Sequence, residues 1–350
     1  MKRLVAGLAL AWMQSGCLAW PLAVDAGHLV KLSVAKVPVE KVLQDPGLSA
    51  EARHKLELLE QAKRYAQDSL GLKVTRNYSA YVDTGRPVLS WTLQAAPPLE
   101  LDHYYWKFPL VGSMPYMGFF NKEQGLKMER NLESKGYDAL LRPVPTFALP
   151  LFADPATNCM LLAPDAYLVN LVIHETCHNT IAVKNYSTFN ENVCEFIGNQ
   201  GAVAFAEEVD GPDSELAVYA RGFKNDAGRY TDFINTLAAK LALLYASPLT
   251  DAEKLTRKAE IFRQARPDYQ RLCDTEMETD YFRRYLDFEW HNALVVYSQL
   301  YFQDQAVFDR VFAAHGRDLA ATIAFLKGLE QVQEEPLRFL QQWLERRNEP

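Results

Sequence analysis

A change of sequence pattern near residue 163 constrains the fold more than any other feature. Residues 73–120 are rich in Val, Tyr, Trp and Thr and are broken by five prolines, which is typical of short strands and loops. From Asp165 onward, apolar residues recur every three or four positions, as they do in helices packed against a core. We therefore expect an α+β protein with a mixed first half and a mainly helical second half.

Individual elements follow from the same patterns. In the first half we expect a helix over 49–70 capped by Ser49, a helix over 122–134 and a strand over 137–144. In the second half, Pro248 and Pro267 should separate helices, and Gly316 should follow a helix end. The helices expected there cover 165–183, 188–209, 213–246, 251–264 and 293–302.

No flexible linker marks the change of pattern. We therefore expect the mature chain, residues 17–350, to form one catalytic unit whose two halves are 17–163 and 164–350. The formal net charge is −7 and there is no long Lys/Arg run, so the chain lacks the basic footprint of a nucleic-acid-binding protein. Nucleic acid is not expected as a partner.

The first sixteen residues have the features of an export signal. A basic start, Met1-Lys2-Arg3, precedes an apolar run over 4–13 that is too short to span a bilayer. The run ends at Ser15-Gly16-Cys17, which resembles a bacterial lipobox, although Gln14 departs from its usual aliphatic residue. This predicts lipidation of Cys17 and a lipid-anchored protein on the periplasmic face of the outer membrane. The alternative is an ordinary cleaved signal and a protein free in the periplasm.

The strongest chemical motif is His174-Glu175-Thr176-Cys177-His178. Residues four apart share one helical face, so both imidazoles can bind a single metal ion. Glu175 lies beside them and can act as general base on a water at the metal.

A third ligand should follow soon, because catalytic zinc takes three protein ligands and keeps one position open. Asn190, Glu191 and Glu195 lie at the start of the next expected helix. This N-E-x-x-x-[D/E] pattern resembles the second zinc helix of the gluzincins, and the resemblance implies that Glu191 binds one Zn²⁺ and that Glu195 orients a zinc-binding imidazole. Alternatively, Thr188-x-x-Glu191 is a capping box, in which Glu191 only satisfies backbone amides.

The segment 171–198, LVIHETCHNTIAVKNYSTFNENVCEFIG, resembles the "putative aminopeptidase" family of bacterial envelope lipoproteins. Shorter matches in the family's order extend the resemblance over nearly the whole mature chain. They include Leu70-Gly71-Leu72, Arg86-Pro87, 116–120, Gly136-Tyr137-Asp138, Asn292-Ala293 and Tyr297.

The chain also departs from that family. Relatives often carry cysteines where this chain has Lys107 and Ser113, so a bridge expected there is absent. Residues 146–150 differ from the small, polar segment of relatives, which affects substrate preference if they line the cleft. The Gly-x-Met-Glu-Asn block of familiar zinc aminopeptidases is missing, so exopeptidase action rests on the family name alone.

Several residues keep two interpretations. Tyr297 is a candidate to stabilise the oxyanion, with His291 as a second choice, but Tyr297 also lies in an apolar helix where core packing would explain it. Cys177 and Cys194 follow His174 and Glu191 by three residues each. They could be metal ligands, a disulfide or buried apolar residues, and we favour burial, with the disulfide second.

These features predict a zinc-dependent peptidase of the cell envelope that hydrolyses peptide substrates. A non-catalytic zinc-binding envelope protein, acting as a binding module, is the alternative. The intact Glu175 argues against it.

Overall fold

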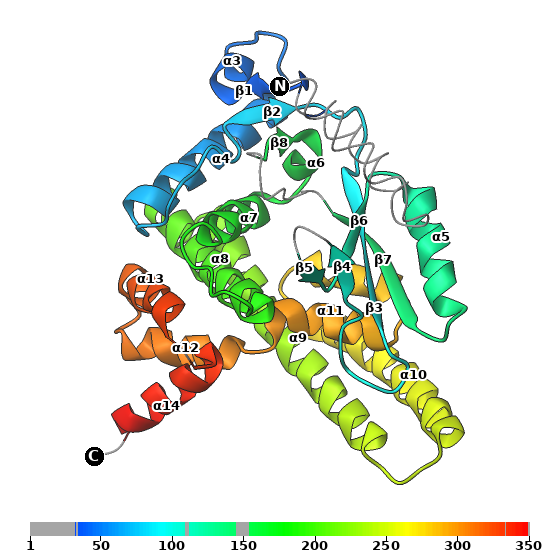
Figure 1. Ribbon diagram of the computed structural model, residues 1–350. Helices are drawn as coiled ribbons and strands as arrows, with labels where there is room; N and C mark the ends of the chain where they lie inside the picture. The colour runs from blue at the N-terminus through cyan, green and yellow to red at the C-terminus, as the bar shows by residue number, and fades with distance from the viewer. Residues whose placement is uncertain (1–31, 33, 109–111, 145–153, 333, 349–350) are drawn as a thin grey trace. The chain divides into compact units, whose positions relative to one another are not determined.

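The computed structural model divides the chain into two compact units, which are described separately (Figure 1). The first comprises residues up to 47 with 77–95 and 104–162, and the second comprises 48–76, 96–103 and 163–350. The structure describes residues 32, 34–108, 112–144, 154–332 and 334–348. The expected signal, Cys17 and the segment 146–150 lie outside the described residues.

The first unit is built on a three-stranded sheet with β3 (Ser90–Ala96) between β6 (Met117–Phe119) and β7 (Asp138–Val144). Helix α5 (Lys122–Glu133) packs on β7. Apolar side chains from these four elements form one core, made of Leu93, Ala95, Met117, Phe119, Leu132 and Ala139 together with Trp106. The strand expected at 137–144 and the helix expected at 122–134 are therefore confirmed.

Two smaller sheets complete the first unit. One joins β1 (Val37–Pro38), β2 (Ala80–Val82) and β8 (Ala156–Thr157), next to the short helices α3 (Val39–Leu43) and α6 (Asn158–Leu161). The other pairs β4 (Trp106–Phe108) with β5 (Gly112–Met114), and in its register Lys107 lies opposite Ser113. Lys107 and Ser113, the two positions singled out in the sequence, are thus cross-strand neighbours.

The second unit is helical. Its long helices are α4 (Ala50–Asp68), α7 (Asp165–Cys177), α8 (Ser187–Val209), α9 (Glu215–Tyr245), α10 (Asp251–Thr275) and α11 (Asn292–Phe302). The 3-10 segment η1 (Tyr281–Asp287) joins α10 to α11, and α12 (Gln305–Ala314), α13 (Leu319–Lys327), η2 (Gly328–Gln331) and α14 (Pro336–Asn348) follow. Helix α7 packs on α4, α8 and α9, while α8 also contacts α11 and α12 (Figure 1). Helix α4, expected in the mixed half, therefore belongs to the helical unit.

Several helix ends form where the sequence predicts them. The Ser49 side chain accepts a hydrogen bond from the Ala52 amide at the start of α4. Pro248 lies between α9 and α10, and Gly316, at φ 69°, follows the end of α12.

Two expected helix ends are wrong. Helix α10 continues through Pro267 to Thr275. The part after the proline is held by Tyr269, which is fully buried and donates a hydrogen bond to the Phe282 carbonyl, so tertiary packing outweighs the cost of the proline. Helix α7 ends at Cys177 instead of residue 183. The chain turns there, because the Asn179 and Thr180 amides donate to carbonyls only three residues back, and the Ile181 side chain is buried.

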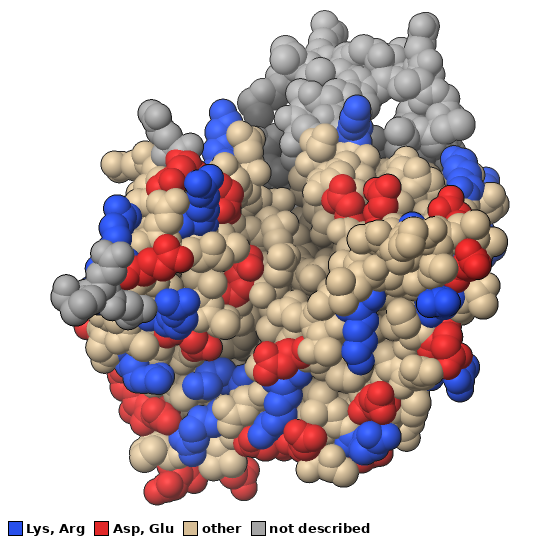
Figure 2. Space-filling model, turned by 90° about the horizontal axis from the view of Figure 1, so that it is seen from below, with Lys and Arg blue, Asp and Glu red and all other residues tan. Residues whose placement is uncertain are grey.

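The described helices include none with the length and apolar character that crossing a bilayer requires. On the face drawn in Figure 2, acidic and basic side chains are interspersed, and neither sign forms a continuous field. This surface agrees with the low net charge of the sequence.

Candidate metal centre

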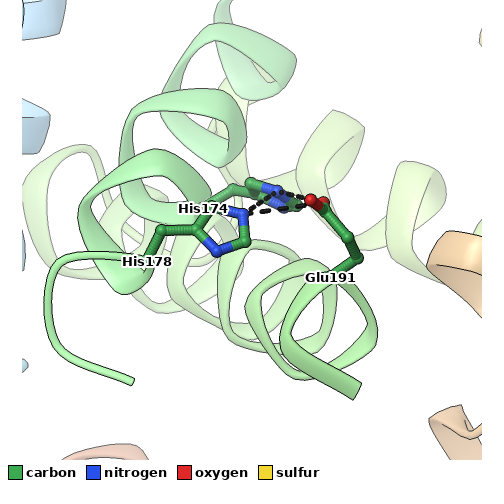
Figure 3. Close-up of side chains that lie close together, drawn as sticks. All are labelled: His174, His178 and Glu191. Carbon is green, nitrogen blue, oxygen red and sulfur yellow. Dashed lines mark hydrogen bonds and ion pairs between the residues drawn. The ribbon is translucent and has the colours of Figure 1, made fainter. Parts of the chain in front are cut away.

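Three side chains from two helices converge in the second unit (Figure 3). His174 lies near the end of α7, His178 is its C-terminal capping residue, and Glu191 lies in the second turn of α8. One nitrogen or oxygen from each lies within 4.8 Å of the others. The Nε2 atoms of the histidines are 3.1 Å apart, and Glu191 Oε2 lies 3.4 Å from the first and 3.5 Å from the second.

The carboxylate of Glu191 does not cap its helix. Helix α8 begins at Ser187, and its N-terminal capping residue is Tyr186, which makes no side-chain capping bond. Glu191 is therefore inside the helix, where its side chain reaches the two imidazoles. The capping-box alternative is wrong, because the helix starts before Thr188.

Close packing fixes the separation of the two helices. Gly198 of α8 lies so near α7 that a Cβ atom there would be 3.1 Å from two atoms of Asn170, the side-chain nitrogen Nδ2 and the backbone oxygen. Gly201 lies equally near Ile173, at 3.0 Å. A larger residue at Gly198 would press on backbone, and one at Gly201 would require the Ile173 side chain to move.

A disulfide between Cys177 and Cys194 also joins the helices, with a Cα–Cα distance of 5.5 Å. We favoured burial over a disulfide for these cysteines; both are indeed buried, but they are bridged and not free. Each cysteine follows a converging residue by three positions, so both point into the same α7–α8 contact. Cys159 and Cys273 are the buried free cysteines.

A chain of polar groups continues from the site between the helices. Glu195 Oε2 lies 3.3 Å from Nδ1 of His174, and its Oε1 accepts a hydrogen bond from Asn199. The Asn199 oxygen in turn accepts one from Asn170 at 2.8 Å. These residues are buried, so their hydrogen bonds hold the imidazole in one orientation.

Electrostatics favour a cation among the three converging groups. Burial alone would lower the pKa of His174, but the adjacent Glu191 and Glu195 carboxylates outweigh it and raise the pKa well above its usual value. Burial alone would raise the pKa of Glu191, but His178 and His174 lower it strongly. The carboxylate therefore stays ionised beside two imidazoles, as in a metal site.

The donor set fits zinc. Two imidazole nitrogens and one carboxylate oxygen are the ligands of a common type of catalytic zinc site, which keeps its fourth position for water or substrate. The second nitrogen of His174 is occupied by Glu195, the usual arrangement for a metal-binding histidine.

The other expected site residues lie in different places. Glu175 is half-buried next to His174, and its charge contributes to the raised pKa of that histidine. Asn190 instead fastens the loop before α8, because its side chain both accepts from the Val183 amide and donates to the Val183 carbonyl, each at 2.9 Å.

Tyr301 is the aromatic residue of α11 that the sequence analysis missed. Its ring centroid lies 6.3 Å from that of His174, whereas Tyr297, one turn earlier, is buried against Tyr285 and Tyr301. His291 is the residue before α11. The i, i+4 spacing of Tyr297 and Tyr301 was the available signal, since both lie on one helix face.

The H-E-x-x-H pair on one helix and the glutamate from the next helix together form a candidate metal centre. The chain belongs to the family described as "Putative aminopeptidase", whose model matches residues 22–339. That description indicates a peptidase. No curated protein and no solved structure matches the chain significantly.

Proposed function

We propose that this protein is a zinc-dependent peptidase in which His174, His178 and Glu191 hold one Zn²⁺ and Glu175 is the general base. One observation carries the proposal: an imidazole pair and a glutamate converge within 4.8 Å in a chain of a peptidase family. The two-helix arrangement is the one expected of gluzincin-like sites.

Zinc, when bound here, would supply Lewis-acid chemistry that makes water nucleophilic near neutral pH and polarises a carbonyl. Glu175 is next to His174 but is not one of the three converging groups, so its carboxylate is available for proton transfer. It takes the proton of the attacking water and passes it to the amine that leaves as the C–N bond breaks. A peptide thus yields a carboxylate and an amine.

A hydrogen-bond donor for the developing oxyanion is the remaining requirement. The sequence points to Tyr297, and we keep it as a candidate. Tyr301 is placed better, because its ring is nearer His174 and is only partly buried.

The cell envelope is the proposed location, with the protein anchored by lipid at Cys17. The support is the sequence alone: a basic start and a short apolar run that ends in Ser-Gly-Cys. Mass spectrometry of the mature amino-terminal peptide tests this. Acyl chains on Cys17 are expected, and an unmodified terminus beginning after residue 17 would contradict the anchor.

Metal removal and return test the proposed activity. The purified protein is analysed for metal and incubated with a peptide library, before and after treatment with a chelator and after addition of Zn²⁺. We expect one zinc per chain, cleavage that stops on chelation, and cleavage that returns with zinc. Hydrolysis that is unaffected by complete removal of metal would contradict the proposal.

A further inference from the structure

A second group of side chains in the helical unit centres on Arg284 of η1. Its guanidinium carbon lies 3.7 Å from the ring centroid of Tyr281, 5.3 Å from that of Tyr285 and 6.0 Å from that of Tyr167. Distances up to about 6 Å correspond to cation–π contact. Three rings thus surround one permanently charged group.

Arg284 has aromatic neighbours, and no acidic counterion lies beside it among the residues that the structure describes. None of the ion pairs among the described residues involves it, whereas the adjacent Arg283 pairs with Asp274 at 2.6 Å. Its side chain is also exposed, and Tyr167 and Tyr281 are only half-buried. The guanidinium is therefore held in place by rings while part of the Arg284 side chain stays open to solvent.

Aromatic rings connect Arg284 to the metal centre. From His174 the ring centroids run to Tyr301 at 6.3 Å, from there to Tyr297 at 5.7 Å, and on to Tyr285 at 6.4 Å. Tyr285 is one of the three rings that contact Arg284. The cation and the candidate metal ligand are thus the two ends of one continuous row of side chains.

Helix α7 gives an estimate of the distance from the metal centre to the group around Arg284. Tyr167 precedes His174 by seven residues, so the two lie on the same face of α7, about 10.5 Å apart along the helix axis. An extended peptide covers about 3.3 to 3.6 Å per residue. About three residues therefore cover the interval from His174 to Tyr167, whose ring contacts Arg284.

We propose that Arg284, held by Tyr167, Tyr281 and Tyr285, binds the carboxy-terminal carboxylate of a short peptide whose scissile bond lies at the metal centre. This inference rests on the proposed peptidase function and specifies its substrate class. The planar guanidinium can bind a carboxylate through two parallel hydrogen bonds. The substrates are peptides with about three residues after the cleaved bond and a free carboxyl terminus.

The test compares peptides that differ only in the terminal group. A tetrapeptide without acidic side chains is used as the free acid and as the amide, and kcat/KM is measured for the wild type, Arg284→Gln, Arg284→Lys and Arg283→Gln. The wild type should prefer the free acid by a factor of about 10 or more, since hydrogen bonds to charged groups are strong ones. Arg284→Gln should lose this preference through slower hydrolysis of the acid alone.

Two further variants show whether the preference depends on Arg284 itself. Arg283→Gln should keep the preference, because its side chain is paired at the surface with Asp274. Arg284→Lys keeps the charge without the planar fork, so its preference should lie between those of the wild type and Arg284→Gln. If Arg284→Gln does not fold, Arg284→Lys alone tests the proposal through its reduced preference for the free acid. An Arg284→Gln enzyme with the wild-type preference would overturn the proposal, as would an amidated tetrapeptide ending in Glu that matches the free acid, since the carboxylate recognised would then be a side chain.

Binding separates failure of this inference from failure of the proposed function. Calorimetry on Glu175→Gln, loaded with zinc, should show the free acid binding more tightly than the amide by a similar factor. If the wild type hydrolyses no peptide but the binding preference for the free acid depends on Arg284, the peptidase proposal fails and the role of Arg284 in binding the carboxylate stands. If the wild type hydrolyses the free acid and the amide equally well, the proposed role of Arg284 fails and the peptidase proposal stands.

Discussion

Glu195 Oε2 lies 3.3 Å from Nδ1 of His174, while the Nε2 atom of the same ring lies 3.4 Å from Glu191 Oε2. One imidazole is thus held between two carboxylates of α8 that are one helical turn apart. The Glu195 carboxylate fixes the orientation of the ring, so that Nε2 is the atom that faces the candidate metal position. Asn199 and Asn170 extend this support into the core.

Replacing Glu191 by alanine should remove the metal and leave the fold intact. Glu191 supplies the only carboxylate among the three converging groups of the described residues. Zn²⁺ affinity should therefore fall by more than about 100-fold, which exceeds the usual loss when a residue that only hydrogen-bonds to a metal ligand is replaced. Glu208→Ala, an exposed position on the same helix, is the matched control and should keep its metal. Metal titration with a chromophoric chelator measures both, and an unchanged affinity in Glu191→Ala would rule out this ligand.

The Gly198→Ala variant should push the two helices of the site apart. A Cβ atom would lie 3.1 Å from the Asn170 backbone oxygen, which cannot move aside cheaply, so we expect a loss of about 1 to 3 kcal/mol in unfolding free energy. Gly228→Ala on α9 has no atom within 4 Å of its new Cβ and should be neutral or stabilising. Urea unfolding compares them, and equal stabilities would mean that α7 and α8 are not closely packed.

Opening the Cys177–Cys194 disulfide should loosen the metal centre. The bridge closes a loop with a sequence separation of 17, for which chain entropy predicts about 3 kcal/mol of stabilisation. The double variant Cys177→Ser, Cys194→Ser should therefore melt at a lower temperature and bind Zn²⁺ more weakly. Cys273→Ser, which alters a free cysteine, is the control. Quantification of free thiols in the unfolded wild type should find this pair oxidised, and two additional thiols would contradict the bridge.

Much of the site could be predicted from the sequence because its parts lie on single helices. The spacing of His174 and His178, and of Glu191 and Glu195, depends only on helical geometry, and the structure brings all four together. The end of α7 was misplaced, but His178 still lies one turn after His174.

What depends on contacts between helices could not be predicted. The pairing of Cys177 with Cys194 requires knowing how α7 crosses α8, which no pattern within either helix reveals. Tyr297 and Tyr301 share one face of α11, and only the packing of α11 and α7 on the helices between them decides which tyrosine approaches His174. Pro267 was misread for the same reason, since burial of Tyr269 elsewhere in the unit keeps α10 continuous.

The half-buried carboxyl group of Asp304 makes the stability of the protein depend on pH. Burial, with a smaller effect of the Glu335 charge, raises the pKa of Asp304 to about 6. Between about pH 4 and pH 6 the folded state keeps a proton that the unfolded state has lost, so the contribution of this group to stability falls as pH rises. At pH 7.5 the ionised group is destabilising.

Asp304→Asn should therefore stabilise the protein at pH 7.5 by about 1 to 2 kcal/mol, allowing for solvent screening, and by little at pH 4. Its side chain makes no capping bond at the start of α12, so the substitution removes no capping interaction. Melting temperatures at the two pH values check this. A gain of the same size at both would show that the ionisation of Asp304 is not the cause.

Side-by-side assay of the wild type and Glu175→Gln tests the central claim most directly. The substitution keeps the size and polarity of the side chain but removes its ability to take a proton at neutral pH. We expect equal zinc content and equal thermal melting, with peptide turnover reduced by a factor of about 100 or more. Equal turnover in the two proteins would contradict the proposed base, and zinc binding without hydrolysis of any library peptide by either would favour a binding module over an enzyme.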